Sequence, residues 1–231
     1  MRVVSLVPSA TETLVALGVV PVGCTRFCEL DDVPTVGGTK NVDVDALAAL
    51  VPDLVVVNDE ENRIEDADAI EARGLALHSM SPRSVADVGP AVCALARAVG
   101  VDPVAPFDAW SAWLEATRVA ARTRAFVPIW RRPWMSLAAD TYGSSLLAHV
   151  GIENVFGDAD ARYPEVALHE VAARAPDVVL LPSEPYAFAE PHAAELRESV
   201  TGVRTIFVDG RDLFWWGVRT PAAAVRLQRV A

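Results

Sequence analysis

The sequence predicts an α/β protein made of two Rossmann-like lobes with mainly parallel sheets, joined by one long bridging α-helix. Three observations predict this class. Short apolar runs alternate along the chain with segments of helical spacing, an order typical of parallel strands and crossover helices. The two halves repeat one another, since LAALVPDLVVVNDE at 47–60 matches EVAARAPDVVLLPSE at 170–184. Between the halves, residues 102–124 begin with two prolines and then continue without a helix breaker.

The first half begins with the apolar run RVVSLV at 2–7, which predicts a buried strand. Ser9 or Thr11 is expected to cap the helix that follows, with Ser9 and Glu12 forming a capping box and Gly18 ending the helix. A long loop is expected at 24–41. The other strands expected in this half are 19–23, 54–57 and 75–80, and the other helices are 43–50, 64–73 and 84–99.

The second half shows the same alternation of strands and helices. The expected strands are 126–137, 178–181 and 204–208, and the expected helices are 142–150, 168–173, 191–199 and 218–230. This gives an N-terminal lobe at 1–101, a bridging helix at 102–124 and a C-terminal lobe at 125–231. The alternative is a single six-stranded doubly wound domain whose halves resemble each other by chance. With the bridging helix as the one link, the lobes are expected to move little relative to each other.

Composition excludes several classes of partner. The chain of 231 residues carries a formal net charge of −11, and no stretch gathers enough Lys or Arg to reverse that field locally. Nucleic acids and anionic membrane surfaces are therefore poor partners. No apolar stretch is long enough to insert into a membrane. The three cysteines form no disulfide framework and no secretory signal is apparent, so the sequence as written indicates a cytoplasmic protein, or an extracytoplasmic one if a signal segment has been removed.

Four stretches occur in an order that identifies a family. They are RVVSLVPSATETLVALG at 2–18, VPTVGGTKNVDVDALAALVPDLVVVNDEEN at 33–62, PWMSLAADTYGSSLLAHVGIENVF at 133–156, and RYPEV at 162–166 followed by APDVVLLPSEPY at 175–186. With these stretches the chain resembles the helical-backbone (class III) substrate-binding proteins of metal-chelate ABC transporters. The resemblance covers essentially the whole chain.

The resemblance implies a function and a set of partners. It implies a monomeric solute-binding protein that holds a metal chelate between its two lobes and delivers it to an ABC permease. Cobalamin or another corrinoid is the first expected ligand, and haem or a ferric siderophore the second, with no covalent cofactor. Exported members of the family carry a leader that this sequence does not show. The alternative is therefore a cytoplasmic member of the fold that acts as an enzyme or chelate-handling protein in a biosynthetic pathway.

Ligand contacts are expected from the loops at the carboxyl ends of the strands, where parallel α/β folds bind their ligands. Aromatic and arginine side chains gather in these loops and suit a broad, flat, partly anionic ligand, because rings stack and guanidinium groups take carboxylates. For any one ring the alternative is packing between the lobes. The candidate ligand-binding residues are Ser9, Phe27, Cys28, Glu60, Tyr142, Arg162, Tyr163, Tyr186, Trp215, Trp216 and Arg219.

The sequence evidence for a metal site or for catalysis is weaker than that for ligand binding. Asp59, Glu60 and Glu61 could take a cation or form a solvated charge run, and the scattered histidines assemble no ligand set. Cys24 and Cys28 have CxxxC spacing without a second pair, which leaves Cys28 as a candidate axial or reactive thiol. No nucleotide, nucleophile-elbow or HExxH motif occurs, so no catalytic residue is expected and binding is favoured over catalysis.

Overall fold

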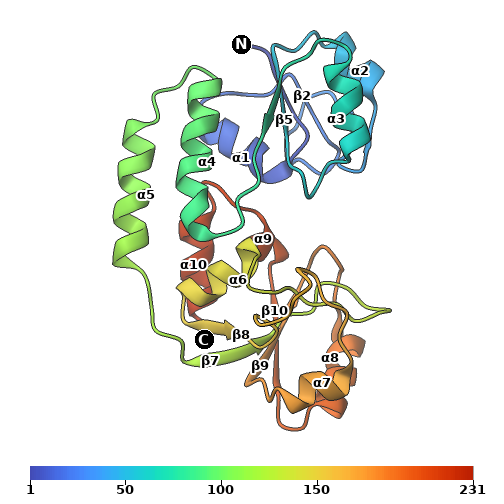
Figure 1. The fold of residues 1–231 in the computed structure, drawn as a ribbon, viewed down its shortest axis with the longest axis vertical. Coiled ribbons are helices and arrows are strands. Elements are labelled where there is room, and N and C mark those ends of the chain that lie inside the picture. The colour runs from blue at the N-terminus through green and yellow to red at the C-terminus, as the bar shows by residue number, and fades with distance from the viewer. Residues whose placement is uncertain (231) are drawn as a thin grey trace. The chain divides into compact units, whose positions relative to one another are not determined.

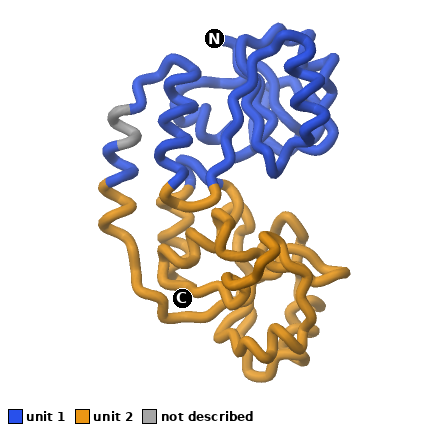
Figure 2. The backbone as a smooth tube through the Cα atoms, in the orientation of Figure 1, with its two compact units in different colours: residues 1–82, 87–111, 216–219 blue, residues 83–86, 112–215, 220–231 orange. Residues whose placement is uncertain are grey.

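The computed structural model describes residues 1–230, including the side chains of all of them except 104–107. The chain divides into two compact units (Figure 2). Unit 1 contains residues 1–82, 87–111 and 216–219, and unit 2 contains 83–86, 112–215 and the chain from Thr220 on. The chain passes from one unit to the other after residues 82, 86, 111, 215 and 219, so the segment 102–124 is not the one link that the sequence suggested.

Unit 1 is built on a parallel four-stranded sheet with the order β2-β1-β5-β6. The central pair has Val4 opposite Val55. Both central strands are short apolar runs buried on both faces, as expected for a parallel sheet covered by helices. The strands of this sheet are β1 (Val3–Ser5), β2 (Gly23–Cys24), β5 (Leu54–Val57) and β6 (Leu77–Ser79), and a separate hairpin joins β3 (Gly37–Gly38) to β4 (Asn41–Val42).

Helices cover both faces of the unit 1 sheet (Figure 1). One face carries α1 (Pro8–Ala16) and α4 (Val85–Ala98), and the other carries α2 (Val44–Ala49) and α3 (Ile64–Glu71). Apolar side chains of the sheet and of α2 and α3 form a continuous core, whose buried members are Val4, Leu6, Val36, Leu47, Val55, Val57 and Ile70.

Unit 2 is built on a second parallel four-stranded sheet, with the order β10-β9-β7-β8. Its strands are β7 (Thr123–Phe126), β8 (Ile152–Asn154), β9 (Val178–Pro182) and β10 (Arg204–Val208). One face carries α7 (Leu168–Ala173) and α8 (Glu190–Ser199), over a core that includes Phe126, Val179 and Leu196. The other carries α6 (Tyr142–His149), α9 (Gly210–Phe214) and α10 (Thr220–Gln228).

The two sheets share one topology. Numbered within its own unit, each sheet has the strand order 2-1-3-4. In each unit the helix after the first strand (α1 or α6) and the helix after the third strand (α3 or α8) lie on opposite faces (Figure 1). The predicted fold class of two Rossmann-like lobes with parallel sheets is thus confirmed, and the alternative of a single six-stranded sheet is wrong.

The expected helix at 102–124 is shorter than predicted. Helix α5 runs from Val104 to Ala116. Two backbone N–H groups beyond the helix donate to another part of the chain. The N–H of Val119 donates to the carbonyl of His149, and the N–H of Arg122 donates to the carbonyl of Gly151, both at a distance of 2.9 Å. Because these carbonyls lie at the end of α6, the segment after Ala116 continues as an extended connection to β7.

Three further local predictions differ from the structure. Val7 is the N-cap of α1, with no side-chain cap, so neither Ser9 nor Thr11 caps this helix and the predicted capping box is absent. A strand is expected at 126–137, but the observed strand β7 lies at Thr123–Phe126 and a long loop follows it. The five-residue helix α9, which has N-cap Asp209, was not predicted because so short a segment shows no periodicity.

Candidate functional site

In each sheet there is a point at which the connections that follow two neighbouring strands leave toward opposite faces. Ligands of open α/β sheets bind in the loops at this point. In unit 1 this point lies between β1 and β5, and in unit 2 between β7 and β9. The loops concerned begin at Leu6 and Asn58 in unit 1, and at Val127 and Ser183 in unit 2.

Two asparagines organise the loop after β5. The Oδ1 of Asn62 accepts the N–H of Asn58 over 2.8 Å, and the Oδ1 of Asn58 accepts the N–H of Glu60 over 2.7 Å. The amide of Asn62 donates to the carbonyls of Leu6 and Thr39, at 3.3 and 3.0 Å. Asn62 therefore ties the loop of β5 to the end of β1 and to the hairpin. The exposed carboxylate of Glu60 is presented from a backbone that is held in place.

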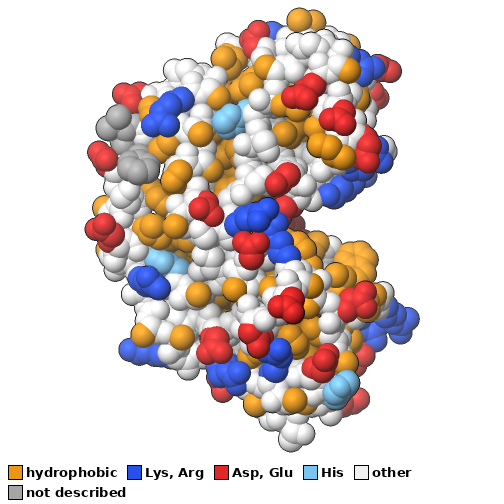
Figure 3. Space-filling view, in the orientation of Figure 1, with side chains coloured by type: hydrophobic (Ala, Val, Ile, Leu, Met, Phe, Trp, Pro, Cys, Tyr) orange, Lys and Arg blue, Asp and Glu red, His pale blue; other side chains and the backbone are white. Residues whose placement is uncertain are grey.

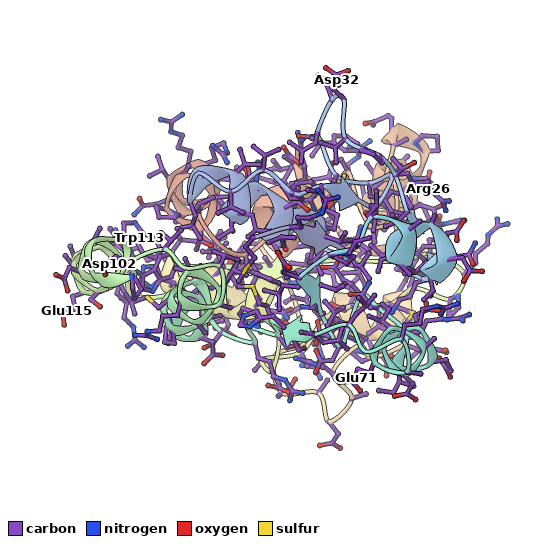
Figure 4. All side chains as sticks on the ribbon, turned by 90° about the horizontal axis from the view of Figure 1, so that it is seen from above. Arg26, Asp32, Glu71, Asp102, Trp113 and Glu115 are labelled. Atoms are coloured by element: carbon purple, nitrogen blue, oxygen red, sulfur yellow. The ribbon has the colours of Figure 1, made fainter. Side chains whose placement is uncertain are left out.

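Phe27 is the main exposed ring of the unit 1 loops. It is 52% exposed, and the guanidinium of Arg26 lies 5.0 Å from its ring centroid. Both side chains pack over Gly38, where a Cβ atom would come within 3.2 Å of them. The Gly37–Gly38 pair therefore forms a hairpin beneath this loop. The acidic tip of the same loop points outward at Asp32 (Figure 4).

Ser9 lies within α1, and Cys28 lies beside this helix. Ser9 is 1% exposed, and its hydroxyl has no hydrogen-bond partner among the described residues. Cys28 is half-buried, with its sulfur 3.1 Å from the hydroxyl of Thr11. A hydrogen bond from Cys24 is the largest cause that lowers the pKa of Cys28 to about 6, against the opposing effect of burial.

In unit 2, two rings meet at the point between β7 and β9. Trp130 follows β7 and is 45% exposed, and Tyr186 follows β9 and is half-buried. Their centroids are 5.3 Å apart with an angle of 76° between the planes, an edge-to-face contact. Tyr186 also contacts His192, whose Nε2 lies 3.4 Å from the phenol oxygen. The N–H of Ala189 donates to Nδ1 of that imidazole over 2.9 Å, which fixes the ring.

The sequence does not indicate Trp130 as a loop residue, because the apolar run at 126–137 predicts a strand. The loop folds back as a hairpin, with the N–H of Ile129 donating to the carbonyl of Met135 over 2.9 Å. The run Arg131-Arg132-Pro133 at its tip was the available signal, since proline is excluded from central strands. Trp134, which stacks on Phe188 with centroids 5.8 Å apart, belongs to the core below.

Arg162 and Tyr163 lie beside this hairpin. The N–H of Ala138 donates to the carbonyl of Arg162 over 2.9 Å. The guanidinium of Arg162 donates to the carbonyl of Asp140 over 2.7 Å and lies 5.9 Å from the centroid of the exposed Tyr163 ring. The structure thus brings Arg162, Tyr163 and the Trp130–Tyr186 pair into one group of loops in unit 2.

Three other candidates are held within the scaffold. Tyr142 is buried, with its hydroxyl 2.8 Å from that of Thr220. Trp216 is only 4% exposed. Arg219 makes two hydrogen bonds, of 2.9 and 2.8 Å, to the carboxylate of Glu12. Tyr142 and Arg219 therefore already have structural partners, and Trp216 is enclosed by the scaffold.

Trp215 ends α9 as its C-cap and is half-buried. The guanidinium of Arg211 lies 6.0 Å from its ring centroid. The adjacent tryptophans thus differ in burial, and Trp215 is the one that retains exposed surface.

Charge and metal-ligating groups are dispersed. On the face drawn in Figure 3, acidic and basic side chains are interspersed rather than separated by sign. Across the described residues no group of three or more His, Cys, Asp and Glu side chains could hold a metal ion. No helix within 1–230 combines the length and apolar character needed to cross a membrane.

Comparisons with known proteins give a consistent result, although no family model matches the chain. A vitamin B12-binding protein of Vibrio vulnificus (strain CMCP6) is 23% identical over 249 residues, which cover 99% of this chain and 88% of that protein. The solved periplasmic vitamin B12 binding protein BtuF of Vibrio cholerae superposes with a TM-score of 0.83 and 18% identity, covering 99% of this chain and 95% of that one. The periplasmic heme binding protein HutB of the same organism gives 0.85 and 17%, covering 100% and 98%.

These comparisons bear on two predictions. They confirm the resemblance of the sequence to the helical-backbone (class III) substrate-binding proteins. They do not support the cytoplasmic location expected from the sequence, because these solved neighbours are described as periplasmic.

Proposed function

We propose that this chain, whose fold and sequence are those of the helical-backbone (class III) substrate-binding proteins, is a monomeric solute-binding protein for a metal chelate. Cobalamin is the first ligand proposed, and haem the second. We further propose that it works outside the cytoplasm and delivers the chelate to an ABC permease.

The observation that carries the proposal is the match along nearly the whole chain. The relative named vitamin B12-binding protein covers 99% of this chain, and so does the solved B12-binding neighbour. A match of this extent includes the loops at the carboxyl ends of both sheets, and ligands of open α/β sheets bind at such loops.

The chemistry of these loops suits a flat macrocycle. In unit 2, the Trp130–Tyr186 pair offers ring surface, with Tyr163 in the same group of loops. In unit 1, Phe27 and the guanidinium beside it offer a ring and a cation. Rings take the apolar face of a macrocycle, and guanidinium groups take the carboxylate or phosphate groups at its edge. Binding of this kind requires no covalent bond to the protein.

Titration of the purified chain with chelates tests the proposal. Cyanocobalamin, haem and a ferric hydroxamate siderophore are added separately, and binding is followed by calorimetry and by the visible spectrum of the chelate. We expect saturable binding of one cobalamin per chain, with haem weaker. Saturable binding of haem alone would overturn cobalamin as the first ligand. If none of the three chelates binds saturably, the proposed function is wrong.

A further inference from the structure

Two of the three cysteines flank one tight turn in unit 1. Cys24 ends β2 and is 1% exposed, whereas Cys28 is half-buried. Between them the chain makes a tight turn, closed by the N–H of Cys28, which donates to the carbonyl of Thr25 over 3.0 Å. This turn carries Cys28 back toward Cys24, and the two side chains interact.

The sulfur of Cys28 is surrounded by groups able to donate to it. The hydroxyls of Thr11 and Thr25 lie 3.1 and 3.4 Å from it, in addition to the thiol of Cys24. The hydroxyl of Thr11 is also 3.0 Å from the carbonyl of Val7, but that carbonyl already accepts the N–H of Thr11 over 2.9 Å. The hydroxyl can therefore turn to the sulfur without leaving the carbonyl unsatisfied.

These contacts give the two sulfurs different roles. Hydrogen bonds from Cys24, Thr11 and Thr25 stabilise a thiolate at Cys28, and they lower its pKa to about 6. The same contact with Cys28, together with burial, raises the pKa of Cys24, which keeps its proton. Cys28 is thus the accessible nucleophile, and Cys24 is a protonated thiol held beside it.

Cys93 provides an internal comparison. It is buried in α4, and its sulfur lies 3.8 Å from the carbonyl of Pro103. Burial raises the pKa of its thiol. It has neither a second sulfur nor a hydroxyl as a hydrogen-bond partner among the described residues. Cys93 is therefore expected to be inert where Cys28 reacts.

We propose that Cys28 and Cys24 form a peroxide-reactive dithiol that closes to an intramolecular disulfide. The sulfur of Cys28 attacks one oxygen of hydrogen peroxide, the O–O bond breaks, and the departing hydroxide takes a proton and leaves as water. Cys28 is then a sulfenic acid. The sulfur of Cys24 attacks that of Cys28, the S–O bond breaks, and the hydroxyl leaves as a second water with the proton of Cys24. Two thiols are oxidised by two electrons and one peroxide is reduced.

The position of Arg26 between the two cysteines makes the product easy to detect. Trypsin cleaves after Arg26, so Cys24 and Cys28 fall in separate peptides, 3–26 and 27–40. A Cys24–Cys28 disulfide joins these peptides until a reductant separates them. Cys93 falls in a third peptide, 84–97.

The experiment treats the reduced, desalted full chain with one equivalent of hydrogen peroxide at pH 7, followed by alkylation, digestion and mass analysis. We expect peptides 3–26 and 27–40 to be joined, and Cys28 to be consumed roughly tenfold or more faster than Cys93. With dimedone present, Cys24→Ser should carry the label on Cys28, and Cys93→Ser should behave as the wild type.

Other results of the same experiment would overturn the proposed dithiol. Oxidation of Cys93 at the rate of Cys28 would overturn the proposal, as would a wild-type Cys28 that goes on to sulfinic acid without joining Cys24. Cys28→Ser must leave the thiol of Cys24 intact under the same treatment. The joined wild-type peptides require no variant, so the test does not depend on how well a variant folds.

Discussion

The guanidinium of Arg219 and the carboxylate of Glu12 form a two-point ion pair between positions 207 residues apart, with N–O distances of 2.9 and 2.8 Å. The pair joins α1 to the segment 216–219, which crosses into unit 1 near the end of the chain. Gly217 lies against the same helix, since a Cβ atom there would come within 2.2 Å of the hydroxyl of Thr13. Arg219 therefore fastens the last crossing of the chain to its first helix.

Glu12→Gln should lower the free energy of unfolding by about 1–2 kcal/mol, because it leaves a mostly buried guanidinium without its carboxylate. Urea denaturation of the wild type and the variant measures the change. The double variant Glu12→Gln/Arg219→Met should recover part of the loss, and Glu71→Gln, at an exposed position, should change little. If Arg219→Met instead left stability unchanged and abolished chelate binding, the guanidinium would be a ligand contact.

Trp216→Ala should destabilise the protein rather than weaken binding alone. The side chain is 4% exposed, and removing a core tryptophan costs about 3–5 kcal/mol. Trp215→Ala, at the half-buried neighbouring position, is the matched control and should cost less stability. Thermal melting of both variants distinguishes the two positions. Equal melting temperatures would mean that the burial of Trp216 contributes little.

Trp130→Ala should weaken chelate binding while leaving the fold intact. The ring is 45% exposed, so its loss removes a stacking surface and little core. Truncating such an anchor typically costs about 1–3 kcal/mol of binding, roughly a 5–150-fold loss of affinity. The control is Trp134→Ala, which removes a ring stacked in the core and should lower the melting temperature. Unchanged affinity of Trp130→Ala for every chelate that the wild type binds would exclude this ring from the site.

The regular elements were predictable where local signals agree. The strands at 54–57 and 204–208 and the helix at 168–173 have the predicted bounds, because glycine or a charged residue occurs within three positions of each end. The repeat of the two halves predicted two equivalent sheets, and both have the same strand order.

The loops were less predictable, because their structure depends on distant partners. Apart from Arg131-Arg132-Pro133, the segment after Phe126 is as apolar as a strand. Hydrogen bonds within it and to 162–166 make it a hairpin that presents Trp130. The sequence selected Arg219 as a ligand contact by residue type and position, but nothing near it in sequence indicates Glu12. The early end of α5 likewise depends on the carbonyl groups of His149 and Gly151, at the end of α6 and just beyond it, and carries no local signal.

Acidification should destabilise unit 2 through His149. The Nε2 of this histidine lies 2.8 Å from the hydroxyl of Thr117, which itself donates to the carbonyl of Trp113, so Nε2–H is the donor to Thr117. Burial, and secondarily the charge of Arg118, lowers the pKa of His149 below its ordinary value. The unfolded chain therefore takes up a proton more readily than the folded protein. The associated stability is fully present above about pH 6.5 and is lost as the pH falls from there through the folded pKa.

Urea denaturation of wild type and His149→Gln at pH 7.5 and 5.5 measures this effect. The wild type should lose more stability than the variant over this range, and the exposed His169→Gln should behave as the wild type. Burial also lowers the pKa of His78, so a residual loss is expected to persist in His149→Gln and to shrink further in the double variant with His78→Gln. A pH dependence that is identical in the wild type and His149→Gln would show that His149 titrates alike in the folded and unfolded chain.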